Sequence, residues 1–225
     1  MSGFSNQSFS VLAELQANNT KEWYDANKDR LVTHVRAPFA AMLGITTALL
    51  EGSSLPMIGS DKTMFRQNRD VRFSKDKTLY KTNVSGMLTP SGVKGGLAGL
   101  VYAQLGPEGG FLAAGYYQLS TPQLNLVRDQ ILANPARFTE ITDALAVKGL
   151  VRSSEGSLKT MPRGYTQHAD HELADALRLK RYVVSTPQPK EVWLNGDIVE
   201  HIVAMAEAIA PLLRFGRDAL SKQAS

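Results

Sequence analysis

The side chains most able to do chemistry in this sequence are concentrated between Lys62 and Lys81. That stretch holds seven basic residues and two acids, Asp70 and Asp76, and so carries a net charge of +5. The whole chain, with 25 Lys and Arg against 21 Asp and Glu, carries only +4. A guanidinium presents a planar fork to phosphate or carboxylate, and an ammonium presents a mobile point charge. This local excess of cations predicts a site for an anionic group.

The alternation of residue types predicts how these cations are presented. Over 65–74, polar and apolar side chains alternate with a period of two, which is typical of a strand, and a second strand is predicted over 80–88. If the two strands pair, their polar faces bring Arg66, Arg72 and Lys81 to one surface. The two acids of the segment would then orient the cations or hold a metal through oxygen.

Aromatic and hydrogen-bonding groups complete the expected site. Tyr80 or Trp23 would contact the flat part of a ligand, and Tyr102, Gln104, Tyr116 and Gln118 are expected on neighbouring positions of the next two strands. Asp70 and His171 are the candidate acid and base. The full set of candidate ligand-binding residues is Trp23, Arg66, Arg69, Asp70, Arg72, Phe73, Ser74, Lys75, Asp76, Lys77, Tyr80, Lys81, Arg163, His171 and Lys180.

Several classes of site are not indicated. His168 and His171 are spaced to share a helix face, but no third ligand follows at a recognised spacing, so we predict no metal site and no cofactor. The stretch 91–96 lacks the Gly-Lys-Ser/Thr ending of a phosphate-binding loop and is interpreted as a strand connection. With no cysteine, disulfides and thiolate chemistry are excluded.

The length of the apolar segments predicts where in the cell the protein lies, because none of them is long enough to span a membrane. The longest apolar run, over 39–50, has about a dozen residues, whereas a membrane span needs about 20. The N-terminus has neither the basic nor the apolar region of a signal peptide. We therefore expect a cytoplasmic protein without a membrane partner.

The elements that must position these residues are predicted in the order helices, strands, helices, which indicates a single α+β domain over 1–225. We expect an antiparallel sheet of about four strands, with one face covered by the N-terminal and C-terminal helices. The predicted strands are 65–74, 80–88, 98–105 and 111–119, with further short strands at 149–154 and 182–184. The predicted helices begin near residues 9, 19, 121, 135, 170 and 196, with Asn19 and Asp170 as caps. Pro38 is expected either to kink the helix that begins at residue 19 or to start a second helix at its first turn, and Pro211 is expected to kink the last helix.

Three stretches together resemble a known family, the domain of unknown function 2461. They are the run 18–24 with Asn27-Lys28, the run 69–77 with Tyr80-Lys81-Thr82, and Pro162-Arg163-Gly164-Tyr165 followed by His171 and Leu177-Arg178-Leu179-Lys180. The sequence has Leu79 and Glu172 where the family usually has proline, but it keeps the charged residues of the motifs. The resemblance implies an α+β domain and supplies no reaction.

Three hypotheses about function follow. The first is a pocket for a small anionic ligand, such as a nucleotide or a phosphorylated metabolite, with or without catalysis. The second is a nucleic-acid-binding module, in which the same cations follow a phosphate backbone. The third is a structural or interaction domain in which Arg69, Asp70 and Asp76 form a buried ion network.

Overall fold

The N-terminal part of the chain is helical. The structure, a computed structural model, describes residues 3–72, 74–95, 99–153 and 156–224. Helices α1 (Asn6–Ala17) and α2 (Lys21–Leu31) are joined by a short turn. The cap of α2 is Thr20, whose hydroxyl accepts from the backbone N–H of Trp23 at 3.2 Å. The prediction of Asn19 as the cap is wrong, because its side chain is used in a longer-range contact described below.

A single π-helical turn, η1 (Val32–Arg36), connects α2 to α3 (Ala37–Leu50). Pro38 lies at the start of α3, as one of the two predictions for it required. Proline has no N–H to donate to the preceding turn, and its ring crowds the carbonyl there. The wider π turn accommodates both effects, so the chain continues as a helix without breaking.

The sheet has four antiparallel strands in the order β1 (Val84–Leu88), β2 (Leu100–Gly106), β3 (Gly109–Tyr116) and β4 (Tyr182–Pro189). The fold class is therefore confirmed. The predicted strand over 65–74 is wrong: in its described part, residue Asn68 forms only an isolated bridge to Tyr80. The fourth strand is instead β4, which pairs with β3 along its whole length.

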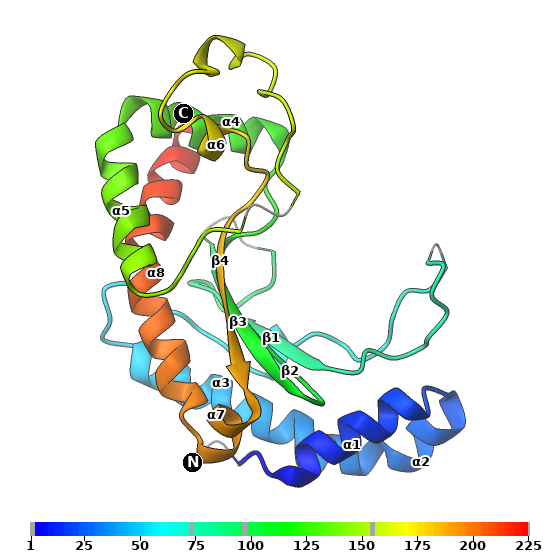
Figure 1. The fold of residues 1–225 in the computed structure, drawn as a ribbon. Helices are drawn as coiled ribbons and strands as arrows, with labels where there is room; N and C mark the ends of the chain where they lie inside the picture. The colour runs from blue at the N-terminus through cyan, green and yellow to red at the C-terminus, as the bar shows by residue number, and fades with distance from the viewer. Residues whose placement is uncertain (1–2, 73, 96–98, 154–155, 225) are drawn as a thin grey trace.

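One face of the sheet is covered and the other is open. Side chains along β2 alternate strictly, with Val101, Ala103 and Leu105 fully buried beneath α8 (Ile198–Leu220), while α3 contacts the neighbouring strand β1. Helix α8 comes very close to β3: a Cβ added at Gly216 would lie 2.3 Å from the ring of Tyr116. No helix of the described residues covers the opposite face (Figure 1).

The remaining helices lie toward the two ends of α8, the first three of them around the C-terminus and the last beside α3 (Figure 1). They are α4 (Thr121–Ala133), α5 (Pro135–Val147), α6 (Ala174–Leu177) and α7 (Lys190–Asn195), with short 3-10 turns η2 (Asp61–Thr63), η3 (Thr166–His168) and η4 (Ser221–Ala224). The helix predicted from Asp170 to residue 179 is only the short α6, and the predicted strand at 149–154 is, in its described residues, one bridge between Arg152 and Val184. Before α6 the chain forms turns, in which the His171 N–H donates to the His168 carbonyl and the His171 ring accepts from the Leu173 N–H, so the helix begins only at Ala174.

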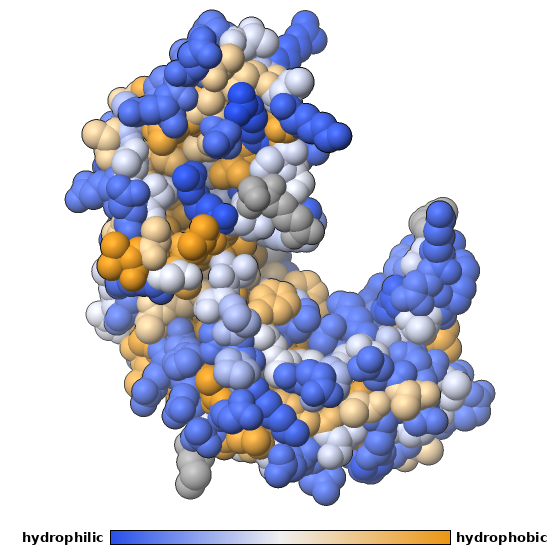
Figure 2. All heavy atoms as spheres, in the orientation of Figure 1, coloured by the Kyte–Doolittle hydropathy of each residue, from blue (hydrophilic) through white to orange (hydrophobic). Residues whose placement is uncertain are grey.

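The space-filling view shows that the molecule is hollowed on one side (Figure 2). Residues 66–80, which we call the arm, project from the sheet on one side of the hollow, and α4, α5 and α6 lie on the other (Figure 1). Figure 2 shows that the surface of the arm is hydrophilic. Within the described residues, no helix combines the length and the apolar character that a bilayer span requires.

Candidate functional site

The base of the arm is fixed to the N-terminal helices. The side chain of Asn19 donates to the Tyr80 carbonyl and accepts from the Tyr80 N–H, both at 2.9 Å. The rings of Tyr24 and Tyr80 stack with centroids 3.9 Å apart. Gln67, which is buried, donates to the carbonyls of Lys81 and Asn83. The arm therefore leaves the body from an ordered base.

Beyond this base, the charges of the arm pair with one another at the surface. Arg72 donates to both carboxylate oxygens of Asp70, at 2.9 and 2.6 Å, and Arg69 donates to Asp76. Both acids are exposed. The ion-network hypothesis predicted that these charges are buried, and that prediction is wrong. Because the ion pairs are exposed to water, screening makes them weak.

These contacts lower the pKa values of both carboxyl groups. The hydrogen bonds from Arg72 lower the pKa of Asp70. The backbone N–H of Thr78, with Arg69 and the Thr78 hydroxyl, lowers the pKa of Asp76 to about 2. Arg69 and Arg72 thus each have a counter-ion within the arm, which reduces their capacity to hold a ligand. Phe73, also predicted at the site, lies outside the described residues.

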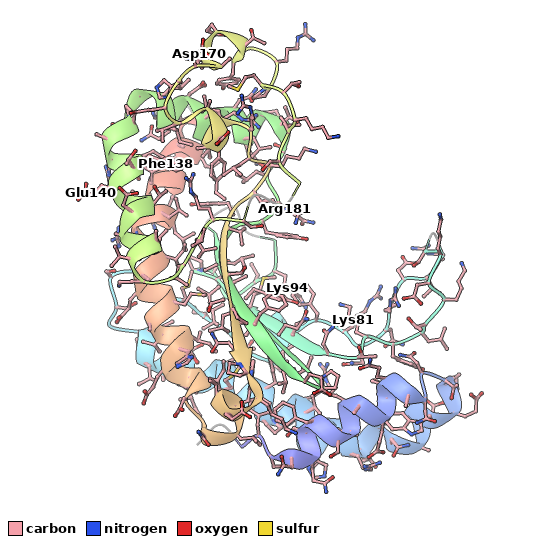
Figure 3. All side chains as sticks on the ribbon, viewed as in Figure 1. Lys81, Lys94, Phe138, Glu140, Asp170 and Arg181 are labelled. Carbon is pink, nitrogen blue, oxygen red and sulfur yellow. The ribbon has the colours of Figure 1, made fainter. Side chains whose placement is uncertain are left out.

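The open face of the sheet holds a better-formed site, which we call the open-face cavity. It has a volume of about 810 Å³, and its lining includes Phe65, Lys81, Lys94, Tyr102, Phe111, Tyr117 and Arg181. Three of these residues are cations, and the described lining residues include no Asp or Glu. Figure 3 shows Lys81, Lys94 and Arg181 along the hollowed side of the molecule.

Phe65 is the centre around which two of the cations gather. The Lys81 ammonium lies 5.2 Å and the Lys94 ammonium 5.7 Å from the centroid of its ring. The backbone on either side is held, since Arg36 donates to the Phe65 carbonyl at 3.3 Å and Lys94 to the Met64 carbonyl at 2.8 Å. The two ammonium groups are therefore kept near each other despite their like charge.

Aromatic rings form the floor of the cavity. Tyr102 lies between Phe65 and Phe111, with centroid distances of 6.0 and 5.7 Å. The Tyr102 hydroxyl donates to Gln104 at 2.8 Å, so the predicted proximity of these two residues is confirmed. At the other end, Arg181 lies over the ring of Tyr117 at 4.5 Å. Flat apolar surface thus lies beside positive charge, which suits a planar anion.

Most of the other predicted residues lie elsewhere. Tyr116 and Gln118 line the open-face cavity together with Tyr102 and Gln104, as predicted. The Tyr116 side chain is buried, however, and its hydroxyl donates to the Leu213 carbonyl at 2.6 Å on the covered face. Tyr80 is buried in the base of the arm. The residues of the predicted site that do not line the open-face cavity are Trp23, Arg66, Arg69, Asp70, Arg72, Ser74, Lys75, Asp76, Lys77, Tyr80, Arg163, His171 and Lys180.

The predicted acid and base are not brought together. Asp70 is on the arm, whereas His171 lies between η3 and α6, across the hollow (Figure 1). The Nδ1 atom of His171 accepts from the Leu173 N–H at 3.0 Å, a local turn contact. The rings of His168 and His171 are 6.2 Å apart, and no group of three or more His, Asp or Glu that could hold a metal occurs in the described residues.

Of the three cations in the cavity, only Lys81 was among the predicted site residues. Lys94 lies in the connection between β1 and β2, within the stretch 91–96 whose basic residue and glycines were the available signal. Arg181 immediately precedes β4 and reaches the site because Tyr116 pairs with Tyr182 across the sheet. A pairing between residues so distant in sequence has no local signal.

The sequence matches one family model. Residues 7–215 match the family described as conserved hypothetical protein (DUF2461), which is nearly the whole chain. The chain belongs to this family. The description gives the DUF2461 family no activity, so a function can be inferred only from the geometry of the site. A search of the curated proteins found no match.

Proposed function

We propose that this DUF2461 protein binds a small organic anion with a flat group in the open-face cavity. The observation that carries the proposal is the charge of the cavity, three cations with no acid among the described lining residues. A volume of about 810 Å³ falls within the range of about 300–1,000 Å³ typical of small-molecule sites. Lys94 and Arg181 supply charge and hydrogen bonds to phosphate or carboxylate, and Tyr102 and Phe111 supply the surface for a ring.

The test is a thermal-shift screen of the purified protein against nucleotides, sugar phosphates, 2-oxo acids and short oligonucleotides. A ligand at a hundred times its Kd stabilises the folded state by about 2.7 kcal/mol. For a chain of this size each kcal/mol raises the Tm by roughly 2–4 °C, so a shift of about 5–10 °C is expected.

Two double variants then place the site. Lys94→Met with Arg181→Met should weaken binding at least tenfold, because each charged hydrogen bond contributes about 1.5–3 kcal/mol. Arg72→Ala with Lys75→Ala, on the arm, removes the same charge outside the cavity and should leave the Kd within about threefold, since arm charges are screened by water. The reverse result would move the site to the arm.

A single-stranded nucleic acid is the second candidate. It is favoured by aromatic rings on an open antiparallel sheet beside a basic arm, since bases stack on such rings. We rank it second because the cavity cations surround one concavity and are not spaced along a track. Binding of an oligonucleotide with a steep linear fall of log K against log salt concentration would favour it over the small anion.

A further inference from the structure

The amine of Lys81 is placed unlike that of a surface lysine. Its ammonium lies on the wall of the open-face cavity, over the ring of Phe65, and Lys81 is only partly exposed. Among the described residues, none pairs with or accepts a hydrogen bond from its Nζ atom. Lys190 offers a comparison, since its ammonium also lies over a phenyl ring, that of Phe9, at 4.6 Å, but outside the cavity.

The charges that act on Lys81 are all of its own sign. Burial, followed by Arg66 on the arm and Lys94 from the connection between β1 and β2, lowers the pKa of Lys81. The other ionisable residues lining the cavity are Tyr102, Tyr117 and Arg181, together with Tyr116, whose hydroxyl is bonded on the covered face. None of them adds a negative charge at neutral pH. A larger fraction of this amine is therefore neutral than at an ordinary lysine.

A neutral amine in such a place is a nucleophile toward carbonyl carbon. Lysines that form imines are activated by desolvation or by a neighbouring cation, and Lys81 has both. Lys94 and Arg181, on the same cavity, would hold the anionic end of a ligand while its carbonyl approaches Nζ. The aromatic floor would hold the rest of the molecule.

We propose that Lys81 is the reactive amine of the open-face cavity and forms an imine with an anionic aldehyde or ketone bound there. This inference rests on the proposed function. The Nζ lone pair forms a bond to the carbonyl carbon, the nitrogen gives up two protons, and the carbonyl oxygen leaves with them as water. The product is a C=N double bond, and the step needs no oxidant or reductant.

The experiment uses pyridoxal phosphate as the probe, because it combines an aldehyde, a phosphate and a flat ring. The full chain is incubated with limiting probe, the imine is reduced with borohydride, and the modified lysines are identified by peptide mass spectrometry over a range of pH. Pyridoxal, which lacks the phosphate, is run in parallel. Lys81→Arg keeps the charge but cannot form the imine, and Lys190→Arg is the matched control.

The expected result is modification of Lys81 at least tenfold faster than of Lys190, with a midpoint at lower pH, loss of this fast phase in Lys81→Arg and retention in Lys190→Arg. Pyridoxal should react at Lys81 at least tenfold more slowly. If pyridoxal phosphate raises the Tm of both the parent and Lys81→Arg, yet modifies lysines without preference, the reactive amine is refuted and the anion site stands. If there is neither a thermal shift nor selective modification, both proposals fail.

Discussion

At the scale of single residues, Asp76 shows how a charge can be strongly held without being buried. Its carboxylate is exposed, yet it accepts from the Thr78 N–H at 2.9 Å, from the Thr78 hydroxyl and from Arg69. These contacts lower its pKa from 3.8 to about 2. Because the pKa falls on folding, the ionised form stabilises the tip of the arm. That stabilisation is complete above the unfolded pKa and is lost as the pH falls through about 2.

We predict that the Asp76 carboxyl titrates at about pH 2 in the folded protein, as followed by its carbon chemical shift in NMR. Arg69→Met removes one of the donors and should raise the midpoint toward the ordinary value of 3.8 without reaching it, because the Thr78 contacts remain. An ordinary midpoint in the parent protein would show that the tip of the arm does not hold this arrangement in solution.

Arg128 is the opposite case, a cation that is buried for structural reasons. It is 2% exposed and donates to the carbonyls of Leu177 and Leu179 at 2.8 and 3.1 Å, and to the Asn125 side chain at 2.8 Å. These bonds join α4 to the chain around α6. The guanidinium here satisfies carbonyls that water cannot reach, and has no part in the open-face cavity.

We predict that Arg128→Met lowers the free energy of unfolding by about 3 kcal/mol, because it leaves two buried carbonyls without donors. Urea denaturation measures this change. Arg137→Met, at an exposed position of α5, should change stability by less than about 0.5 kcal/mol. Equal effects of the two substitutions would contradict the structural role of Arg128.

At the scale of elements, the arm depends on its attachment at Asn19. We predict that Asn19→Ala destabilises the protein by about 1–2 kcal/mol, since two hydrogen bonds to Tyr80 are lost. Hydrogen exchange of the Tyr80 amide should accelerate more than that of the β2 amides. Asn18→Ala is the control, because the Asn18 side chain donates to the Glu14 carbonyl of α1, away from the arm, and the substitution should leave the arm unchanged.

Local patterns were enough to predict much of the fold. Phe9, Leu12 and Leu15 recur at helical spacing and are buried in α1, and Gly106 and Gly109 enclose the turn of the β2–β3 hairpin, which is tighter than the predicted five-residue loop. The alternation over 65–74 was misleading, because it resembles a strand but provides no face that the body can bury. Its residues form a projecting arm instead.

The non-local parts of the site could not be predicted from such patterns. The membership of β4 in the sheet depends on register with β3, more than 60 residues earlier, and this pairing alone brings Arg181 to Tyr117. Lys94 reaches the cavity from the connection between β1 and β2. The segment richest in cations was therefore identified correctly as basic, yet most of its cations lie outside the cavity that the fold creates.

At the scale of the whole molecule, the basic arm and the open-face cavity border the same hollow (Figures 1 and 3). Charges on the arm that never contact a ligand still contribute to the field across this hollow. Such a field raises the rate at which an anion arrives, and does not change how fast it leaves, because the bound ligand contacts the cavity alone. If the proposed anion binds in the cavity, the arm would therefore act in its capture and not in its binding.

We predict that Arg72→Glu with Lys75→Glu lowers the association rate of pyridoxal phosphate several-fold at about 10 mM salt, where the Debye length is about 30 Å. The difference should vanish near 1 M salt, where that length falls to about 3 Å, and the dissociation rate should stay constant. Stopped-flow absorbance measures both rates.

Arg137→Glu with Lys148→Glu changes the net charge equally but around α5, away from the hollow, so it should slow association less. Equal slowing by both pairs would mean that net charge, and not the arm, attracts the ligand, and a change confined to dissociation would place the arm in contact with it.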